Sequence, residues 1–362
     1  MENDKNIGNW LTEMNLGHPL TIAGPCSAET KEQVLEIAHQ LKDNRVTVFR
    51  AGVWKPRTRP GSFEGVGADA LPWLQQVKKE TGLLIAIEVA TANHVKLALE
   101  HDIDILWIGA RTTANPFAVQ EIADSLKDSD KIVWVKNPVN PDLELWIGGV
   151  ERLYKAGVTN LGVIHRGFST YKKTDYRNAP KWQIAIDFKT RFPSIPMIND
   201  PSHICGRRDC IENVAQKALD LQFDGVMIET HHDPDKAWSD AKQQITPNTL
   251  NEIITRLIVR AKTFKSEKAI DKLILLRKEI NETDKILLKT LIERMEIVKK
   301  IAQVKKEKNV AVLQTKRWQQ VIDKMTLLSK ESGLDVRFVT RLFKEVHQES
   351  IRQQEKIVNK KK

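Results

Sequence analysis

The sequence predicts a (β/α)8 barrel followed by an all-helical domain, and two observations support this prediction. Up to Phe264, short apolar runs alternate with amphipathic stretches. Eight such pairs fit into about 245 residues, which is the usual size of a (β/α)8 barrel. After Lys265 the strand patterns stop and helix-forming residues continue. We therefore expect a barrel over residues 1–265 and a helical domain over residues 266–362, with a doubly wound open sheet as the alternative to the barrel.

The expected strands are short runs rich in Val, Ile and Leu. They cover residues 20–24, 46–50, 83–88, 105–109, 132–136, 161–165, 196–200 and 225–229. An amphipathic helical pattern follows each strand, and examples cover residues 32–41, 94–100, 116–126, 143–155 and 248–262. In such barrels the catalytic side chains lie at the carboxyl ends of the strands, so we look for chemistry there.

The helical domain begins with one apolar stripe that predicts a helix over residues 266–308, far longer than the globular mean. Two shorter helices are expected over residues 315–330 and 336–358, with Gly333 ending the first of these two. A long helix with a single apolar stripe needs a partner helix. We therefore expect an all-α three-helix domain that pairs as an intertwined homodimer or assembles into a higher homo-oligomer.

The net charge of +10 comes entirely from the helical domain, which contains 24 Lys and Arg against 14 Asp and Glu. The domain lacks an aromatic-interleaved basic patch, so a small polyanionic ligand is expected in place of nucleic acid. No apolar run is long enough for a membrane span, and the polar start of the chain is unlike a signal peptide. These features predict a cytoplasmic protein that does not bind membranes.

The three cysteines, Cys26, Cys205 and Cys210, match neither a disulfide framework nor a CxxC zinc site, which suits a reducing compartment. Cys26 and Cys205 lie at the ends of strands that would be neighbours in a closed barrel. We therefore expect free thiols, with oxidation able to join Cys26 to Cys205.

Three cations in the long helix indicate a shared anionic ligand. Arg294 and Lys305 lie eleven residues apart, so at about 100° per residue they face the same side of the helix. Arg277 lies seventeen residues before Arg294, which turns it roughly 100° away. If the three bind one ligand, Arg277 comes from the second copy of the helix.

Four candidate metal ligands lie at or beyond the ends of strands that a closed barrel would make neighbours. Cys26 follows the first strand, His203 follows the seventh and Glu229 ends the eighth. Asp240 lies eleven residues after Glu229 in the following loop. One thiol, one imidazole and two carboxylates suit a divalent first-row metal, with Mn, Fe, Co and Zn all compatible.

Basic residues gather at the same strand ends, although residues 1–265 are neutral overall. They are Arg50, Lys55, Arg57, Arg111, Lys136, Arg166 and Arg208, with Thr58 beside Arg57. So many cations on one rim indicate that phosphate or carboxylate groups bind there. Arginine suits a two-pronged clamp and lysine a point contact.

The runs AGPCSAE, FRAGVWKPRTRPGSFEG, IGAR and DPSHICGRRD resemble the type I 3-deoxy-D-arabino-heptulosonate 7-phosphate (DAHP) synthases, in the subgroup similar to octulosonate phosphate synthases. The resemblance spans residues 20 to 262. It implies that phosphoenolpyruvate condenses with erythrose 4-phosphate on a divalent metal, which acts as a Lewis acid. The chain departs from the family after Lys136, where Asn137 and Pro138 replace a second basic residue, and at His165, where an acidic residue is common.

The same resemblance implies a role for each matching position. It makes Cys26, His203, Glu229 and Asp240 the metal ligands. It places phosphoenolpyruvate against Arg50, Lys55, Arg111, Lys136 and Arg166, with Lys55 also catalytic, and the aldose phosphate against KPRT, residues 55–58.

Residues 270–358 resemble the all-helical class of chorismate mutases, through LRKEINETDKILLKTLIERM, TRLFKEV and the positions that follow. The ligand implied is chorismate, a dianion. The resemblance implies that Arg277 comes from the partner subunit, that Arg294 and Arg317 contact carboxylates and hydroxyl, and that Lys305 and Gln354 face the ether oxygen. Ser350 shares a helix face with Gln354. Gln314 stands at a substrate-binding position where aspartate is common, and Trp318 stands where glutamate is usual.

The leading hypothesis is a bifunctional shikimate-pathway enzyme, a DAHP synthase fused to a chorismate mutase, inhibited by prephenate or chorismate through the helical dimer. One alternative keeps the synthase and makes the helical domain mainly a sensor of chorismate or prephenate, which Gln314 and Trp318 favour. Another makes the barrel an octulosonate phosphate synthase that uses arabinose 5-phosphate, although the intact KPRT run favours erythrose 4-phosphate. A nucleic-acid-binding tail is the third alternative.

Overall fold

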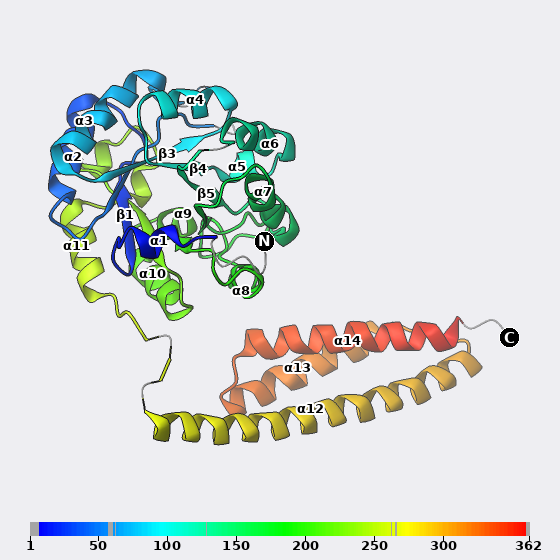
Figure 1. Ribbon diagram of the computed structural model, residues 1–362. Coiled ribbons are helices and arrows are strands. Elements are labelled where there is room, and N and C mark those ends of the chain that lie inside the picture. Colours follow the sequence, from blue (N-terminus) through cyan, green and yellow to red (C-terminus); the bar gives the residue numbers. More distant parts are fainter. Residues whose placement is uncertain are drawn as a thin grey trace. The chain divides into compact units, whose positions relative to one another are not determined.

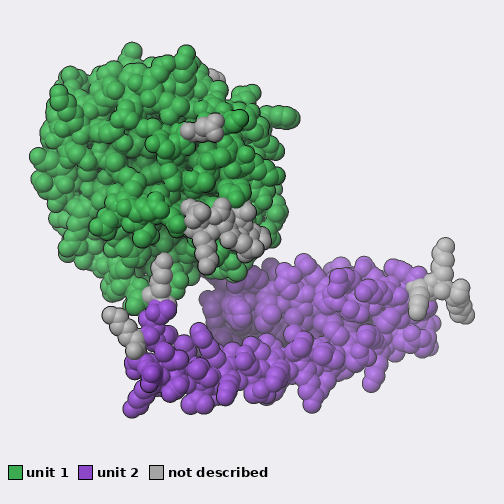
Figure 2. All heavy atoms as spheres, viewed as in Figure 1, with its two compact units in different colours: residues 1–262 green, residues 263–362 purple. Residues whose placement is uncertain are grey.

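The computed structural model describes residues 7–56, 61, 63–127, 129–261, 263–264 and 266–359. The chain divides into two compact units, residues 1–262 and residues 263–362 (Figure 2). Within the described residues, no helix is both long enough and apolar enough to cross a membrane. The predicted domain boundary at residue 265 and the cytoplasmic location stay predictions.

The first unit is a closed barrel of eight parallel strands that neighbour one another in chain order (Figure 1). The strands are β1 (Leu20–Gly24), β2 (Val48–Arg50), β3 (Leu84–Val89), β4 (Ile105–Ile108), β5 (Ile132–Lys136), β6 (Leu161–His165), β7 (Met197–Asn199) and β8 (Gly225–Glu229). Pairing of Gly24 with Glu229 closes the ring between β1 and β8. The predicted barrel is confirmed, and the open-sheet alternative is wrong.

Helices surround the barrel, as Figure 1 shows. They are α2 (Lys31–Leu41), α3 (Leu71–Thr81), α4 (Ala92–Glu100), α5 (Ala110–Thr113), α6 (Pro116–Ser125), α7 (Leu143–Lys155), α8 (Trp182–Arg191), α9 (Pro201–Cys205), α10 (Ile211–Asp220) and α11 (Pro247–Arg256). Side-chain caps fix several starts: the Thr30 hydroxyl accepts from the Gln33 N–H, and Asp142 accepts from the Leu145 N–H. Helix α11 ends before the predicted residue 262, because the backbone becomes extended at Leu257.

The barrel has two apolar layers, one inside the ring of strands and one between the strands and the helices. Ile22, Trp107 and Trp134 fill the inside. A short helix that the sequence did not predict, α1 (Trp10–Glu13), adds Trp10 to this layer. The Trp10 indole donates to the Leu161 carbonyl at 2.8 Å, and its ring lies 6.0 Å from that of Trp134. This packed interior leaves the carboxyl ends of the strands as the place for polar chemistry.

Cys205 and Cys210 form a disulfide. The expectation of free thiols is therefore wrong for Cys205 and Cys210. The expected bond between Cys26 and Cys205 is wrong as well, because Cys205 is already bonded to Cys210. Gly206 adopts a positive φ of 66° at the end of α9 and turns the chain back, which brings the two cysteine Cα atoms to 6.0 Å. Among the described cysteines, Cys26 is free and buried.

The second unit contains three helices, α12 (Glu267–Glu307), α13 (Thr315–Ser332) and α14 (Val336–Val358), close to the predicted ranges. Gly333 has φ 74° and ends α13 as predicted. Helix α14 packs against both α12 and α13. Within residues 266–359 only three apolar side chains, Val298, Ala302 and Val339, are buried, so this unit has almost no core of its own.

Candidate active sites

Side chains from the ends of β1, β7 and β8 converge at the mouth of the barrel. Ligand atoms of Cys26, Glu229 and Asp240 all lie within 4.8 Å of one another. The Cys26 Sγ is 3.5 Å from Asp240 Oδ2, and His203 Nε2 is 3.8 Å from Glu229 Oε1. Three of the four predicted metal ligands therefore form one cluster, and His203 lies beside it through Glu229.

Helix α9 sets the direction of the His203 ring. Asp200 precedes the helix, and its Oδ1 accepts from the His203 backbone N–H at 3.0 Å. Its other oxygen lies 2.8 Å from His203 Nδ1, which directs Nε2 toward Glu229. A carboxylate behind one imidazole nitrogen is the usual way of presenting the other nitrogen to a metal.

The donor set fits a divalent cation. Glu229 is 0% exposed, and its Oε1 has no hydrogen-bond partner among the described residues, although Arg50 Nη1 lies 3.1 Å away. Burial raises the pKa of the Cys26 thiol to about 12, and the charge of Glu229 adds to this effect. Burial also pushes the pKa of Asp240 upward, but the charges of Arg177 and His203 outweigh burial and hold the pKa below its usual range. A buried carboxylate oxygen without a hydrogen-bond partner, beside a thiol and an imidazole, is a place for a metal.

The predicted anion-binding residues divide into several groups. Arg50 and Lys136 are buried and lie 5.0 and 5.4 Å from the centre of the Trp107 ring. Lys55 Nζ donates to Cys26 Sγ at 2.8 Å, which places it against the metal ligands. Arg166 lies at the same mouth, and burial lowers its pKa to about 10.

Arg111 is exposed at the start of α5, close enough for its charge to act on Arg166. Arg208 instead holds the loop after β8, donating to the Gln244 carbonyl at 2.7 Å and pairing with Asp235 at 2.6 Å. Its assignment to substrate stays a prediction. Arg57 and Thr58 lie outside the described residues.

Two of the departures from the family have clear structural roles. Asn137 accepts from the Arg166 backbone N–H at 2.7 Å and donates to the Gly167 carbonyl at 2.8 Å, so it fixes the position of Arg166. His165 is fully buried, with Nε2 2.6 Å from the Pro180 carbonyl, and burial lowers its pKa to about 4. His165 is therefore part of the packed structure.

Sequence reasoning missed Arg177, Asn178, Asp200 and Gln243, which all contact the site. Asp200 carried a detectable signal, since an Asp before Pro-Ser-His is a typical helix cap. Arg177 and Asn178 lie in an irregular loop, and nothing in the sequence pattern connects them with the strand ends.

The helical unit has its own pocket, of about 310 Å³. All the predicted mutase residues except Arg277 line it: Arg294, Lys305, Gln314, Arg317, Ser350 and Gln354. No acidic side chain is among its described lining residues. The pocket is therefore suited to an anion.

Hydrogen bonds organise the polar wall of this pocket. Arg294 Nη1 donates to Ser350 Oγ at 2.6 Å, and Lys305 donates to the Val312 carbonyl. Gln354 Oε1 is buried without a hydrogen-bond partner in the described part of the chain. Trp318, which stands at the usual glutamate position, lies against His347, with ring centres 4.0 Å apart.

Arg277 does not line this pocket. It lies on the same helix, α12, seventeen residues before Arg294 and therefore about 25 Å away along the axis. A single chain cannot bring both guanidinium groups to one small ligand.

Two protein-family models match the chain. The DAHP synthetase I family matches residues 14–263, and chorismate mutase type II matches residues 276–355. The first match covers the barrel with its strand-end residues, and the second covers the helical pocket.

Individual relatives agree with the first match. The phospho-2-dehydro-3-deoxyheptonate aldolase of Thermotoga maritima is 32% identical over 254 residues, which are 70% of this chain and 71% of the relative. A 2-dehydro-3-deoxyphosphooctonate aldolase of Desulfatibacillum aliphaticivorans is 31% identical over 284 residues, covering 71% of this chain and 97% of the relative. The crystal structure of the Thermotoga maritima DAHP synthase aligns with a TM-score of 0.60 at 30% identity, over 65% of this chain and 67% of that one.

Removing a metal ligand should weaken metal binding directly. We expect Cys26→Ser and His203→Ala each to raise the dissociation constant for Mn²⁺ by about 10-fold or more, because each removes one donor from the set. Competition with a fluorescent chelator measures this constant without turnover. His39→Ala, at an exposed histidine on α2, is the control and should bind normally. Unchanged Mn²⁺ affinity in both site variants would contradict the assignment.

Proposed function

This chain belongs to the DAHP synthetase I family, and we propose that it is a bifunctional enzyme of aromatic amino acid biosynthesis, with a DAHP synthase barrel followed by a chorismate mutase domain. Both enzyme activities are supported by the two matching domains, one a transferase and the other an isomerase. The observation that carries the proposal is that the barrel's strand ends hold a cluster of cations beside the candidate metal ligands, while the helical unit has its own cation-lined pocket, each within the domain that its family model matches.

The barrel's proposed reaction is the condensation of phosphoenolpyruvate with erythrose 4-phosphate, which gives DAHP and phosphate. Lys136, Arg166 and Arg111 offer charges for the enol phosphate, and Arg50 is buried beside them. Fixed cations hold the two reactants in line, which lowers the entropic barrier to bond formation. A bound Mn, Fe, Co or Zn ion would act as a Lewis acid on the aldehyde oxygen.

Lys55 is the proposed catalytic lysine. Burial alone would lower its pKa, but the neighbouring Cys26 and Glu229 outweigh burial and raise the pKa above the ordinary value. The ammonium group therefore stays charged and can donate a hydrogen bond to a substrate oxygen beside the metal ligands. Arg57 and Thr58 complete the proposed aldose-phosphate site, and their role there rests on the resemblance of the KPRT run.

The helical unit's proposed reaction is the rearrangement of chorismate to prephenate. This is a unimolecular step, so the site needs no nucleophile and works by holding one conformer and stabilising developing charge. Arg294 and Arg317 supply charges for the carboxylates. Lys305 and Gln354 supply donors for the ether oxygen, which gains negative charge as its bond to carbon breaks.

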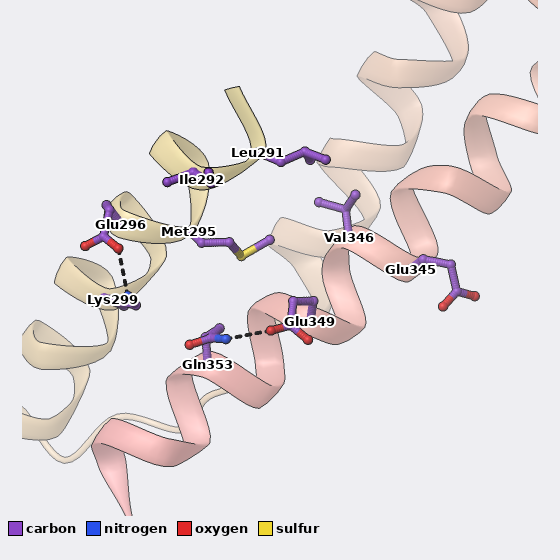
Figure 3. Close-up of a pocket in the computed structure, with 9 residues that line it drawn as sticks. All are labelled: Leu291, Ile292, Met295, Glu296, Lys299, Glu345, Val346, Glu349 and Gln353. Carbon is purple, nitrogen blue, oxygen red and sulfur yellow. Dashed lines mark hydrogen bonds and ion pairs between the residues drawn. The ribbon is translucent and has the colours of Figure 1, made fainter. Parts of the chain in front are cut away.

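A homodimer through the helical unit is part of the proposal. Helix α12 has 41 residues, and most of its apolar stripe is exposed, including Ile280, Leu287 and Leu288. A groove of about 430 Å³ between α12 and α14 is lined by Leu291, Ile292, Met295 and Val346, with charged side chains at its rim (Figure 3). A second copy of the unit supplies apolar helices of matching length for this stripe and groove, and brings its Arg277 to the first copy's pocket.

Feedback control is the last part of the proposal. The pocket of the helical unit lies outside the barrel and is lined by cations without an acidic side chain among its described lining residues. A dianionic pathway product such as prephenate or chorismate would therefore bind there. We expect this ligand to inhibit the synthase through the helical dimer.

The test of the whole proposal is to assay both reactions on the intact chain, with and without prephenate. We expect DAHP formation with a clear preference for erythrose 4-phosphate over arabinose 5-phosphate, loss of chorismate absorbance, and slower DAHP formation when prephenate is present. Preference for arabinose 5-phosphate would overturn the synthase assignment. Absence of chorismate turnover would make the helical unit a sensor. Inhibition that survives deletion of residues 266–362 would contradict feedback through this unit.

The two-chain mutase site predicts complementation. Arg277→Ala and Lys305→Ala should each abolish most mutase activity, because each removes a cation from both pockets of a homodimer. Mixed heterodimers should recover activity, since one of their two pockets is intact. Refolding the variants together and measuring the loss of chorismate absorbance checks this. Mixtures no more active than the separate variants, despite confirmed heterodimers, would contradict the shared site.

The lowered pKa of Lys305 predicts that mutase activity decreases at alkaline pH. Burial lowers this pKa below the ordinary 10.5, and the charged form is the stronger donor and the one that balances the negative charge developing on the ether oxygen. Mutase kcat/KM should therefore be constant near neutral pH and fall as pH rises through that lowered pKa. Lys305→Arg should move the fall to higher pH, because a guanidinium keeps its proton. A profile that is identical in the two proteins would show that another group controls the rate.

A further inference from the structure

Two consecutive residues outside the predicted sites, Arg177 and Asn178, contact both the candidate metal ligands and a candidate phosphate-binding arginine. They lie in the loop between β6 and α8. In sequence they are far from Asp240, which lies 63 positions after Arg177. None of the roles proposed above uses them.

Arg177 holds both carboxylate ligands. Its Nη1 donates to Asp240 Oδ1 at 3.0 Å and to Gln243 Oε1 at 2.7 Å. The Gln243 amide then donates from Nε2 to Glu229 Oε2 at 2.6 Å. Gln243 is 1% exposed, so its orientation is fixed by these two bonds. One guanidinium therefore sets the direction of Asp240 itself and of Glu229 through one amide.

Asn178 connects the helix that carries His203 with Arg166. Its Nδ2 donates to the His203 carbonyl at 2.7 Å, and its Oδ1 accepts from Arg166 Nη1 at 2.9 Å. Its backbone N–H donates to the Ile204 carbonyl at 3.1 Å, which fastens the loop to α9. The same amide thus touches an element of the metal site and an element of the anion site.

The backbone of α9 is shaped to receive the Arg177 side chain. Gly206 ends this helix, and a Cβ at that position would lie 2.5 Å from Arg177 Cβ and 2.8 Å from its Cδ. The stem of Arg177 therefore packs directly on the turn that follows His203. This packing restricts the conformations of the Arg177 side chain, although the side chain is about half exposed.

We propose that Arg177 and Asn178 are positioning residues that orient Asp240, Glu229 and the His203 helix for the metal, and that Asn178 also couples this site to Arg166. The physical reason is that Asp240 and Glu229 are like charges held close together, so the metal-free site needs a cation that keeps both carboxylates pointing inward. The coupling follows because Asn178 cannot move away from Arg166 without also changing its bond to α9. This inference rests on the proposed metal-dependent synthase.

The experiment measures binding in the intact chain without turnover. Metal-free protein is titrated with Mn²⁺ against a fluorescent chelator, and separately with phosphoenolpyruvate by calorimetry. We expect Arg177→Gln to weaken Mn²⁺ binding by about 10- to 100-fold while changing phosphoenolpyruvate affinity by less than about threefold. Asn178→Ala should weaken both ligands, phosphoenolpyruvate by about threefold to tenfold.

A matched control is Arg191→Gln, at another half-exposed arginine paired with one carboxylate, Glu144, at 2.6 Å. It should leave both affinities unchanged. Arg177→Lys keeps the charge, but its shorter side chain holds the ammonium group back from the position where Nη1 bonds Asp240 and Gln243, so its Mn²⁺ affinity should be intermediate. If Arg177→Gln fails to fold, Arg177→Lys decides the question.

The outcomes separate this inference from the proposed function. Native Mn²⁺ affinity in the folded Arg177 variants overturns the positioning role and leaves the metal site intact. A phosphoenolpyruvate affinity unchanged in Asn178→Ala overturns the coupling. A wild-type chain that binds no Mn²⁺ removes the proposed metal site itself.

Discussion

The charge of Glu229, buried at the end of β8, is the constraint on which the mouth of the barrel depends. A carboxylate without solvent needs nearby compensation, because the cost of removing it from water is large. Arg50 lies 3.1 Å from it, and Gln243 donates to its second oxygen. Burial raises the pKa of Glu229, but His203 and Arg50 outweigh burial and lower it, so the group stays ionised. Replacing such a cluster with apolar residues would often stabilise a protein, which indicates that its value lies in binding.

A different constraint governs the helical unit, whose helices have too little buried apolar surface to stand alone. Val298, Ala302 and Val339 are buried, while a long row of Ile and Leu side chains on α12 is exposed. The proposed pairing with a second copy would account for this exposed row and for the position of Arg277 far from the pocket. Folding of the unit and assembly of its anion site are then the same event.

The sequence predicted the barrel and much of the candidate site because both depend on local patterns. Apolar runs located the strands, and Glu229 and Lys136 stand at strand ends where a reader of the sequence can find them. Arg177 and Asn178 could not be found this way, since their roles arise only when the loop after β6 folds back onto α9. Arg208, a cation predicted on the same rim, holds the loop after β8, and its role toward substrate stays a prediction. The Cys205–Cys210 disulfide was missed because a spacing of five positions does not reveal a bridge until the turn at Gly206 is known.

Anomalous diffraction at the manganese edge, from crystals of the intact chain grown with Mn²⁺, tests the central claim most directly. The account predicts one strong peak in each barrel within bonding distance of Cys26 Sγ, His203 Nε2 and carboxylate oxygens of Glu229 and Asp240. A peak bound by other residues, or a barrel mouth without manganese in a crystal that holds it elsewhere, would contradict the account.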